Sequence, residues 1–160
     1  METAFAPLAE DVLEIVANTV WCTVTTVDAA GRPRSRILHP IWEVVDDRPV
    51  VWVMTARTPV KTAHIAANLH VALSYWSPAQ DTVIADCVAS WVEDAATKRH
   101  VWDLFATTPP PLGYDPSGGG ALDGPDNPVF TPLRLDPWRV QVMRFAGWDN
   151  LAWRTWRDDV

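Results

Sequence analysis

Short runs of β-branched and aromatic residues, separated by turn signals, recur along this chain and limit the folds open to it. Such runs are typical of β-strands, and turn sequences such as DAAG at 28–31 join them closely. Because short helices lie between some of the runs, we expect a mainly β (α+β) fold: a barrel or a curled antiparallel sheet. The predicted strands cover residues 20–27, 32–38, 50–55, 71–76, 82–93, 138–145 and 151–157.

Three helices are expected between these strands. Apolar residues recur at helical spacing over 8–17, which predicts a first amphipathic helix. Thr58 and Pro59 form an N-cap followed by proline at the first helical position, so a second helix begins there and runs to about Asn68. Asp94 can cap a third helix.

The second helix carries a lysine where a positive charge is mildly unfavourable. Lys61 falls in the first turn, where free N–H groups and the helix dipole are already positive, so an anion would make the position favourable. An earlier predicted strand, 32–38, carries Arg32, Arg34 and Arg36, and the alternation of side chains along a strand places these three on one face. That face is either a solvated edge or an anion site. Two cationic segments and many aromatic residues together favour a phosphorylated planar cofactor.

Charge and motifs exclude several classes of function. The formal charge of −7 argues against nucleic acid or an anionic membrane as the main partner. The chain has no G-x-S-x-G elbow, P-loop or dinucleotide fingerprint. Its four histidines are scattered, so we expect no metal site, and we expect two of them to lie at the surface, namely His64 and His70.

We expect one domain over residues 1–160 and a cytoplasmic location. The N-terminus is acidic and lacks the pattern of a secretory signal, and no stretch is apolar for long enough to span a bilayer. Cys22 and Cys87 lie in strand-like runs and are expected to be buried free thiols. The segment 107–128 is rich in proline and glycine, and we expect it to be a mobile cover near the functional site.

The segments quoted next, at these spacings, resemble one known family. "TVTTVDAAGRPRSRIL" is similar to its first strand–turn–strand unit, and "VWVMTARTPVKTAHIAANLHVALSYW" is similar to the strand, helix and strand that follow. "CVASWVEDAATKRHVWDLF" fits the next strand and helix more loosely. The chain resembles the pyridoxamine 5'-phosphate oxidase-like superfamily of flavin-binding split barrels, which includes deazaflavin-dependent reductases, over residues 8–105.

This resemblance implies a six-stranded antiparallel split β-barrel, a homodimer and cofactor sites at the subunit interface. It also implies FMN as the cofactor, with its phosphate bound by Arg36 and Lys61. The isoalloxazine would be lined by Ile37, Leu38, His39, Met54 and Thr55. Several of the ten tryptophans are then expected in the core or the subunit interface.

The implied function is an FMN-dependent oxidoreductase acting on a small molecule. The flavin would carry the chemistry, so no catalytic side chain is assigned. Val60 replaces the arginine that pyridoxamine phosphate oxidases carry before the lysine, and the tail lacks their histidine motif, so we do not expect that substrate. Two alternatives remain: a reductase using the 8-hydroxy-5-deazaflavin coenzyme, whose polyglutamyl tail Arg32 and Arg34 could bind, or a non-catalytic flavin- or haem-binding protein.

Overall fold

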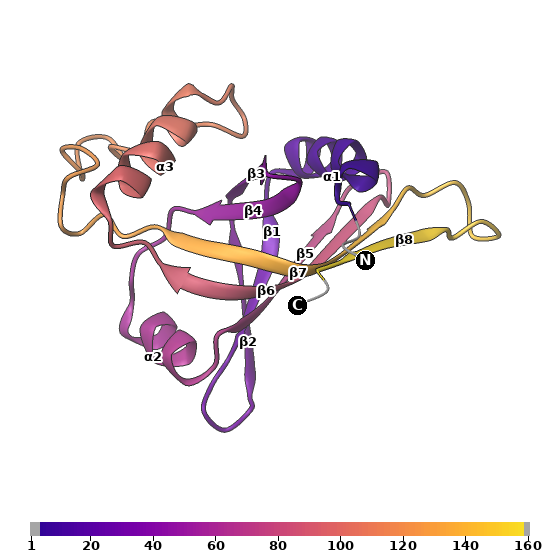
Figure 1. Ribbon diagram of the computed structural model, residues 1–160, viewed down its shortest axis with the longest axis horizontal. Coiled ribbons are helices and arrows are strands. Elements are labelled where there is room, and N and C mark those ends of the chain that lie inside the picture. The colour runs from indigo at the N-terminus through magenta and orange to yellow at the C-terminus, as the bar shows by residue number, and fades with distance from the viewer. Residues whose placement is uncertain (1–3, 159–160) are drawn as a thin grey trace.

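The computed structural model describes residues 4–158, which form one twisted antiparallel sheet with three helices against it (Figure 1). The helices are α1 (Ala6–Thr19), α2 (Pro59–Ala67) and α3 (Ala95–Thr107). The strands are β1 (Cys22–Val27), β2 (Pro33–Leu38), β3 (Pro40–Val45), β4 (Arg48–Val53), β5 (His70–Trp76), β6 (Thr82–Trp91), β7 (Leu133–Met143) and β8 (Trp153–Arg157).

The order of the strands forces the sheet to curl. They pair in the order β2-β1-β5-β6-β7-β4-β3, and β8 pairs with β7 outside this path. β2 and β3 are therefore the two ends of the path, yet β2 ends at Leu38 and β3 begins at Pro40. Because only His39 separates them in the chain, the two ends of the sheet must come together there, although no ladder joins them. This is the split barrel that the family resemblance implied.

The number and lengths of the strands differ from the expectation. Eight strands are present in the described part of the chain, not six. β3 was not predicted, and β7 begins at Leu133, five residues earlier than expected. Pro137 lies inside β7 because the β6–β7 register shifts beside its partner, Cys87, and leaves Trp138 without a partner in β6. A bulge accommodates a proline within a sheet.

Two apolar clusters fill the molecule. The main cluster lies between the inner face of the sheet and α1, which contributes Leu8, Val12, Ile15 and Val16. A second cluster lies where α3 and the following loop cover β3 and β4. β4 is therefore buried on both faces after its first residue, and β3 over its first three residues. Its buried members are Ile41, Val50, Trp52, Val92, Val101, Phe105 and Phe130.

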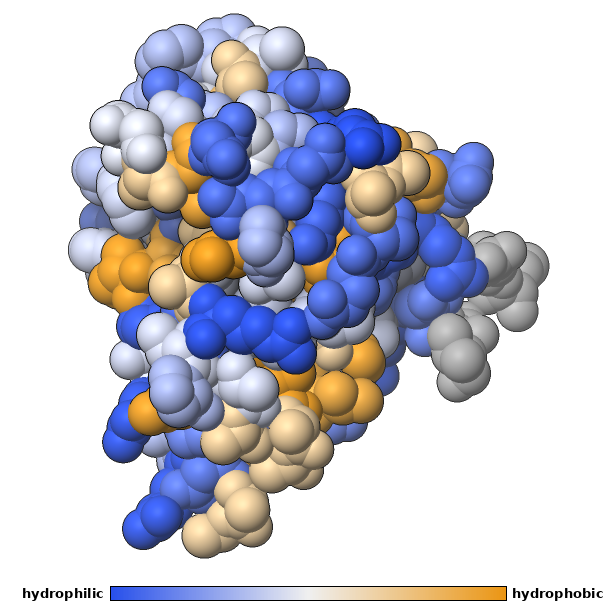
Figure 2. Space-filling model, turned by 90° about the vertical axis from the view of Figure 1, so that its left-hand side faces the viewer, coloured by the Kyte–Doolittle hydropathy of each residue, from blue (hydrophilic) through white to orange (hydrophobic). Residues whose placement is uncertain are grey.

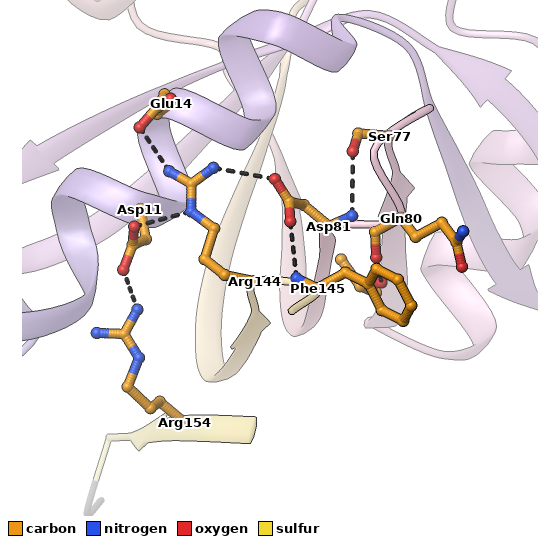
Figure 3. Close-up of polar contacts among 9 residues, drawn as sticks. Asp11, Glu14, Ser77, Gln80, Asp81, Arg144, Phe145 and Arg154 are labelled. Atoms are coloured by element: carbon orange, nitrogen blue, oxygen red, sulfur yellow. Dashed lines mark hydrogen bonds and ion pairs between the residues drawn. The ribbon is translucent and has the colours of Figure 1, made fainter. Parts of the chain in front are cut away.

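An ion-pair network fixes α1 to the part of the sheet formed by the β5–β6 turn, the end of β7 and β8 (Figure 3). Arg144, just after β7, donates from Nε to Asp11 at 2.9 Å, from Nη1 to Asp81 at 3.0 Å, and also to Glu14. Arg154 of β8 reaches the second oxygen of Asp11. One guanidinium thus joins the first helix, the β5–β6 turn and the end of β7.

Hydrogen bonds set the charge states of this network. Arg144 lowers the pKa of Asp11, mainly through its hydrogen bond and against the opposing effect of burial. Burial also disfavours the charged form of Arg144, but the hydrogen bonds to Asp11, Asp81 and Glu14 outweigh it and raise the pKa of the guanidinium. The central pair of the network, Asp11 and Arg144, is therefore charged at neutral pH.

The segment between α3 and β7 has no regular secondary structure, and it packs on the second cluster through Leu112 and Leu122. Cys22 and Cys87 are buried free thiols, as predicted. Within residues 4–158, no helix has the length and apolar character needed to cross a membrane.

We predict that Arg144→Gln lowers the free energy of unfolding by about 1–3 kcal/mol at pH 7, because three carboxylates lose their shared partner. Asp11 has a lowered pKa in the folded state, so its contribution is present above the unfolded value of about 4 and is lost as the pH falls through the folded value. Urea unfolding at several pH values should therefore show the gap between the variant and the wild type narrowing below about pH 4.

Arg99→Gln is the matched control, because Arg99 pairs with Asp126 at 2.8 Å with both side chains largely exposed. It should change stability by less than about 1 kcal/mol. An equal loss in both variants would contradict a special role for the network.

Candidate functional site

Arg36, one of the residues predicted to bind the cofactor phosphate, lies on the inner face of the sheet. It pairs with Val24 across the β1–β2 ladder, so its side chain shares the face of Val24 and Thr26. Its Nη1 donates to Thr26 Oγ1 at 3.0 Å, and Thr26 is fully buried. The same hydroxyl lies 2.9 Å from His64 Nδ1 on α2. A buried threonine therefore links the arginine strand to the helix.

Lys61 of α2 lies near Arg36, and we call Arg36, Lys61 and Thr55 the cationic cluster. Thr58 caps the helix as predicted, since its Oγ1 accepts from the Lys61 backbone N–H at 3.4 Å. The helix turns Lys61, His64 and Ile65 toward the protein interior. The Lys61 ammonium donates to Thr55 Oγ1, on the segment that follows β4.

The cationic cluster carries positive charge that no carboxylate of the described residues neutralises. Burial lowers the pKa of Lys61, and the charge of Arg36 lowers it further. Burial and the nearby Arg34 likewise lower the pKa of Arg36. Within residues 4–158, neither Arg36 nor Lys61 forms an ion pair with an acidic side chain. Two half-hidden cations that disfavour each other make a site that an anion would stabilise.

An apolar cavity of about 470 Å³ lies beside the cationic cluster. Ile37 follows Arg36 in β2, and Met54 precedes Thr55, so the two features share adjacent backbone segments. The view in Figure 2, from the side of α2, α3 and the loop, shows apolar patches between hydrophilic ones. The cavity is lined by Trp21, Ile37, Leu38, His39, Met54 and Tyr114.

Aromatic rings surround His39 in this cavity. Its ring centroid lies 4.9 Å from that of Trp21 and 5.1 Å from that of Tyr114. Burial lowers the pKa of His39, although a hydrogen bond with the Leu112 backbone works in the opposite direction. Its Nε2 is buried and has no hydrogen-bond partner among the described residues. A buried polar atom without a partner, in an aromatic cavity, suits a planar ligand with its own polar atoms.

All seven residues predicted to bind the cofactor lie in this one region. Four of them line the cavity: Ile37, Leu38, His39 and Met54. Arg36, Thr55 and Lys61 form the neighbouring cationic cluster. The structure thus brings together two segments that are remote in the sequence, while the binding roles themselves stay predictions.

Some residues of the site were not singled out from the sequence. The prediction that His64 lies at the surface was wrong, because it is buried against Thr26, whereas His70 is exposed as expected. Thr26 could have been found as a polar residue at an inward position of a strand. No sequence signal pointed to Tyr114, which reaches the site from the irregular loop.

The comparison with protein families matches the chain to the family model described as "Pyridoxamine 5'-phosphate oxidase" over residues 8–141. A search of curated proteins finds no significant match.

Solved structures share the fold at low sequence identity. A pyridoxamine 5'-phosphate oxidase-related, FMN binding protein from Nostoc punctiforme has a TM-score of 0.66 at 16% identity, covering 100% of both chains. The haem storage protein HutZ from Vibrio cholerae has a TM-score of 0.58 at 20% identity, covering 81% of this chain and 89% of that one. An F420 reductase has a TM-score of 0.54 at 17% identity, covering 79% and 93%.

We predict that Lys61→Met leaves the ligand-free protein at least as stable as the wild type at pH 7. The methionine keeps the apolar stem and removes a charge whose pKa folding lowers, and such a charge opposes folding below the unfolded value of about 10. The wild type should gain stability on this account as the pH rises toward that value, and the variant should not. Thermal unfolding of flavin-free protein between pH 7 and 10 measures this.

Lys98→Met, at the chain's other lysine, is the control and should keep the pH dependence of the wild type. If Lys61→Met were clearly less stable at pH 7, the lysine would have a structural role instead.

Proposed function

The chain belongs to the pyridoxamine 5'-phosphate oxidase family, and from this premise we propose that it binds FMN and acts as an oxidoreductase on a small molecule. The observation that carries the proposal is the cationic cluster, in which the half-buried Arg36 and the buried Lys61 have no carboxylate partner in the described chain, beside an aromatic cavity. A phosphate and a planar ring are the two chemical parts that such a pair of features suits.

Arg36 and Lys61 would hold the phosphate. The guanidinium can offer two parallel N–H groups, and Thr26 fixes its orientation from below through a 3.0 Å hydrogen bond. Lys61 adds a point charge at the N-terminus of α2, where backbone N–H groups also favour an anion. Thr55 would position the lysine through its hydroxyl.

The cavity would hold the isoalloxazine. Ile37 and Met54 provide apolar contact area, and the rings around His39 provide flat surfaces for stacking. The unpartnered Nε2 of His39 could bond a polar atom of the ring system. When bound, the flavin supplies hydride and electron transfer, and the protein supplies binding, orientation and exclusion of water.

One contact favours FMN over the deazaflavin coenzyme. Arg32, a candidate for binding a polyglutamyl tail, is paired with Asp28 at 2.8 Å within its own turn. Arg34 then remains as the exposed cation of this strand. The alternatives are supported by two structural neighbours: the F420 reductase supports a deazaflavin cofactor, and HutZ supports haem.

We further propose that a second copy of the chain covers the outer face of the sheet. Ile37 and Trp76 point outward from their strands and are 60% and 67% exposed, and Trp21 at the cavity is 57% exposed. Large apolar side chains exposed in this way are typical of interaction surfaces. A homodimer would bury them and close the cavity.

We predict that the purified protein carries a flavin spectrum or acquires one with added FMN. Lys61→Met and Arg36→Gln should each weaken FMN binding about ten- to hundredfold, because each removes charge-assisted hydrogen bonds. The double variant should lose less than the sum of the two free energies if both side chains hold one phosphate. Fluorescence titration with FMN measures all three.

Riboflavin is the matched ligand control, since it lacks the phosphate, and its affinity should barely change in these variants. If the purified protein showed the absorption band of a deazaflavin, or the Soret band of haem, the cofactor would be the deazaflavin coenzyme or haem instead of FMN. Normal FMN affinity in both single variants would show that these residues do not hold the phosphate.

We also predict that Trp76→Arg shifts the protein from dimer to monomer and lowers FMN affinity in parallel, because a charge on the outer face opposes burial. Trp148→Arg is the control, since Trp148 is 76% exposed in the β7–β8 turn, off the strands. Light scattering at micromolar concentration measures the assembly state. A wild-type monomer that binds FMN tightly would contradict the dimer.

A further inference from the structure

A second cavity lies beside the first, on the side of the loop. Its volume is about 240 Å³, and it shares Met54 and Tyr114 with the cavity proposed for the isoalloxazine. Its other walls are the segment after β4 and the loop before β7, chiefly Leu122 and residues 129–132. The proline- and glycine-rich segment 107–128 therefore contributes Tyr114 and Leu122 to this cavity, and the residues that follow it, 129–132, complete that wall.

The walls of the second cavity carry no charge. All its lining residues are neutral, and most are apolar. Arg57 follows the lining segment, but it pairs with Glu93 at 2.6 Å and stacks over Trp91 with 5.0 Å to the ring centroid. On the loop, Asp126 is held by Arg99. Asp115 and Asp123, which follow lining residues, accept hydrogen bonds from Ser117 and Asn127. The Lys61 ammonium donates to Thr55, which is itself a lining residue, but the proposed function assigns this cation to the flavin phosphate. Once the flavin is bound, no cation is left to neutralise a charged ligand in this cavity.

Tyr114 stands between the two cavities and offers one polar group. Its ring lies 5.2 Å from that of Phe105 and 5.1 Å from that of His39, centroid to centroid. Its backbone N–H donates to the Phe105 carbonyl at 3.0 Å, which fixes the residue to the end of α3. Burial raises the pKa of Tyr114 to about 12, so the hydroxyl keeps its proton at neutral pH. Within residues 4–158 this hydroxyl has no hydrogen-bond partner.

The loop is anchored where it forms the cavity wall. A Cβ on Gly113 would lie 1.7 Å from the Thr108 carbonyl oxygen, so only glycine allows the chain to turn so closely. The Gly113 N–H closes this turn by donating to the Pro109 carbonyl at 3.0 Å. At the other end Phe130 is buried edge-on against Trp102, with centroids 5.2 Å apart. The wall next to Tyr114 is therefore held by specific contacts at both ends.

We propose that this second cavity binds a small uncharged molecule, mostly apolar and of about one ring in size, and that Tyr114 donates a hydrogen bond to an acceptor on it. The volume lies below the roughly 300–1,000 Å³ of sites for drug-sized ligands, which limits the occupant to a small compound. A phosphate or carboxylate would enter without a partner and lose its hydration. On the premise of the proposed function, such a molecule next to the flavin cavity is the redox substrate.

Acetophenone, benzoate and phenyl phosphate are suitable probes, because they share one ring and differ in charge. We expect acetophenone to shift the backbone amide signals of Ala56, Leu122 and Thr131 saturably in NMR titrations of the purified protein. In the FMN-loaded protein, where the phosphate of FMN occupies Lys61, benzoate and phenyl phosphate should shift these signals at least about tenfold more weakly, since neither charge finds a partner. Equal binding of the anions would overturn the proposal.

Two variants test the named contacts. Tyr114→Phe should weaken acetophenone about three- to tenfold, the worth of one hydrogen bond, and leave toluene unchanged because toluene has no acceptor. Ala56→Phe should fill the cavity and abolish both, while Ala121→Phe, the same change on an exposed loop residue outside the lining, should abolish neither. Unchanged acetophenone binding in Ala56→Phe would overturn the site.

FMN affinity is measured separately in the same samples. Probe binding without FMN binding would support the cavity and remove the flavin from the proposed function. FMN binding with no shift of the three amides by acetophenone would overturn the inference and leave the proposed function standing.

Discussion

The single residue between β2 and β3 is the constraint on which the rest of the architecture depends. These strands lie at opposite ends of the strand order, and only His39 separates them along the chain. The sheet must therefore curl until its two ends meet, but no backbone ladder seals the seam. A seam without a ladder leaves room between side chains, and the aromatic cavity lies there, with His39 in its wall. Fold and site thus follow from the same short connection.

The parts of the fold that sequence could predict are those with a local cause. Thr58 and Pro59 start α2 through capping chemistry that involves only neighbouring residues, and the structure shows that cap. The elements that were predicted wrongly depend on residues that are distant in the sequence. Pro137 made the start of β7 look like a loop, because the bulge that accommodates it is formed with Cys87 on another strand. β3 was missed because Pro40, which usually ends a strand, here begins one.

The same distinction explains what could be predicted of the site. The position of Lys61 in the first turn of a helix was enough to suggest an anion-binding role. The alternation of the arginines along one strand suggested the same role for them. The burial of His64 depends on Thr26, 38 residues earlier, which no periodicity in a nine-residue helix reveals. Tyr114 comes from a segment without any period, so only the three-dimensional packing against Phe105 and His39 shows its position.

The network around Arg144 also has a consequence for how the chain is made. Asp11 and Arg144 are separated by 133 residues, so the ribosome completes α1 long before its anchor exists. At about 5–20 residues per second the delay is on the order of ten seconds, and during it Val12 and Ile15 have no sheet to cover them. A nascent amphipathic helix in that state exposes apolar surface of the kind that promotes aggregation. The first element to be synthesised is thus among the last to be secured.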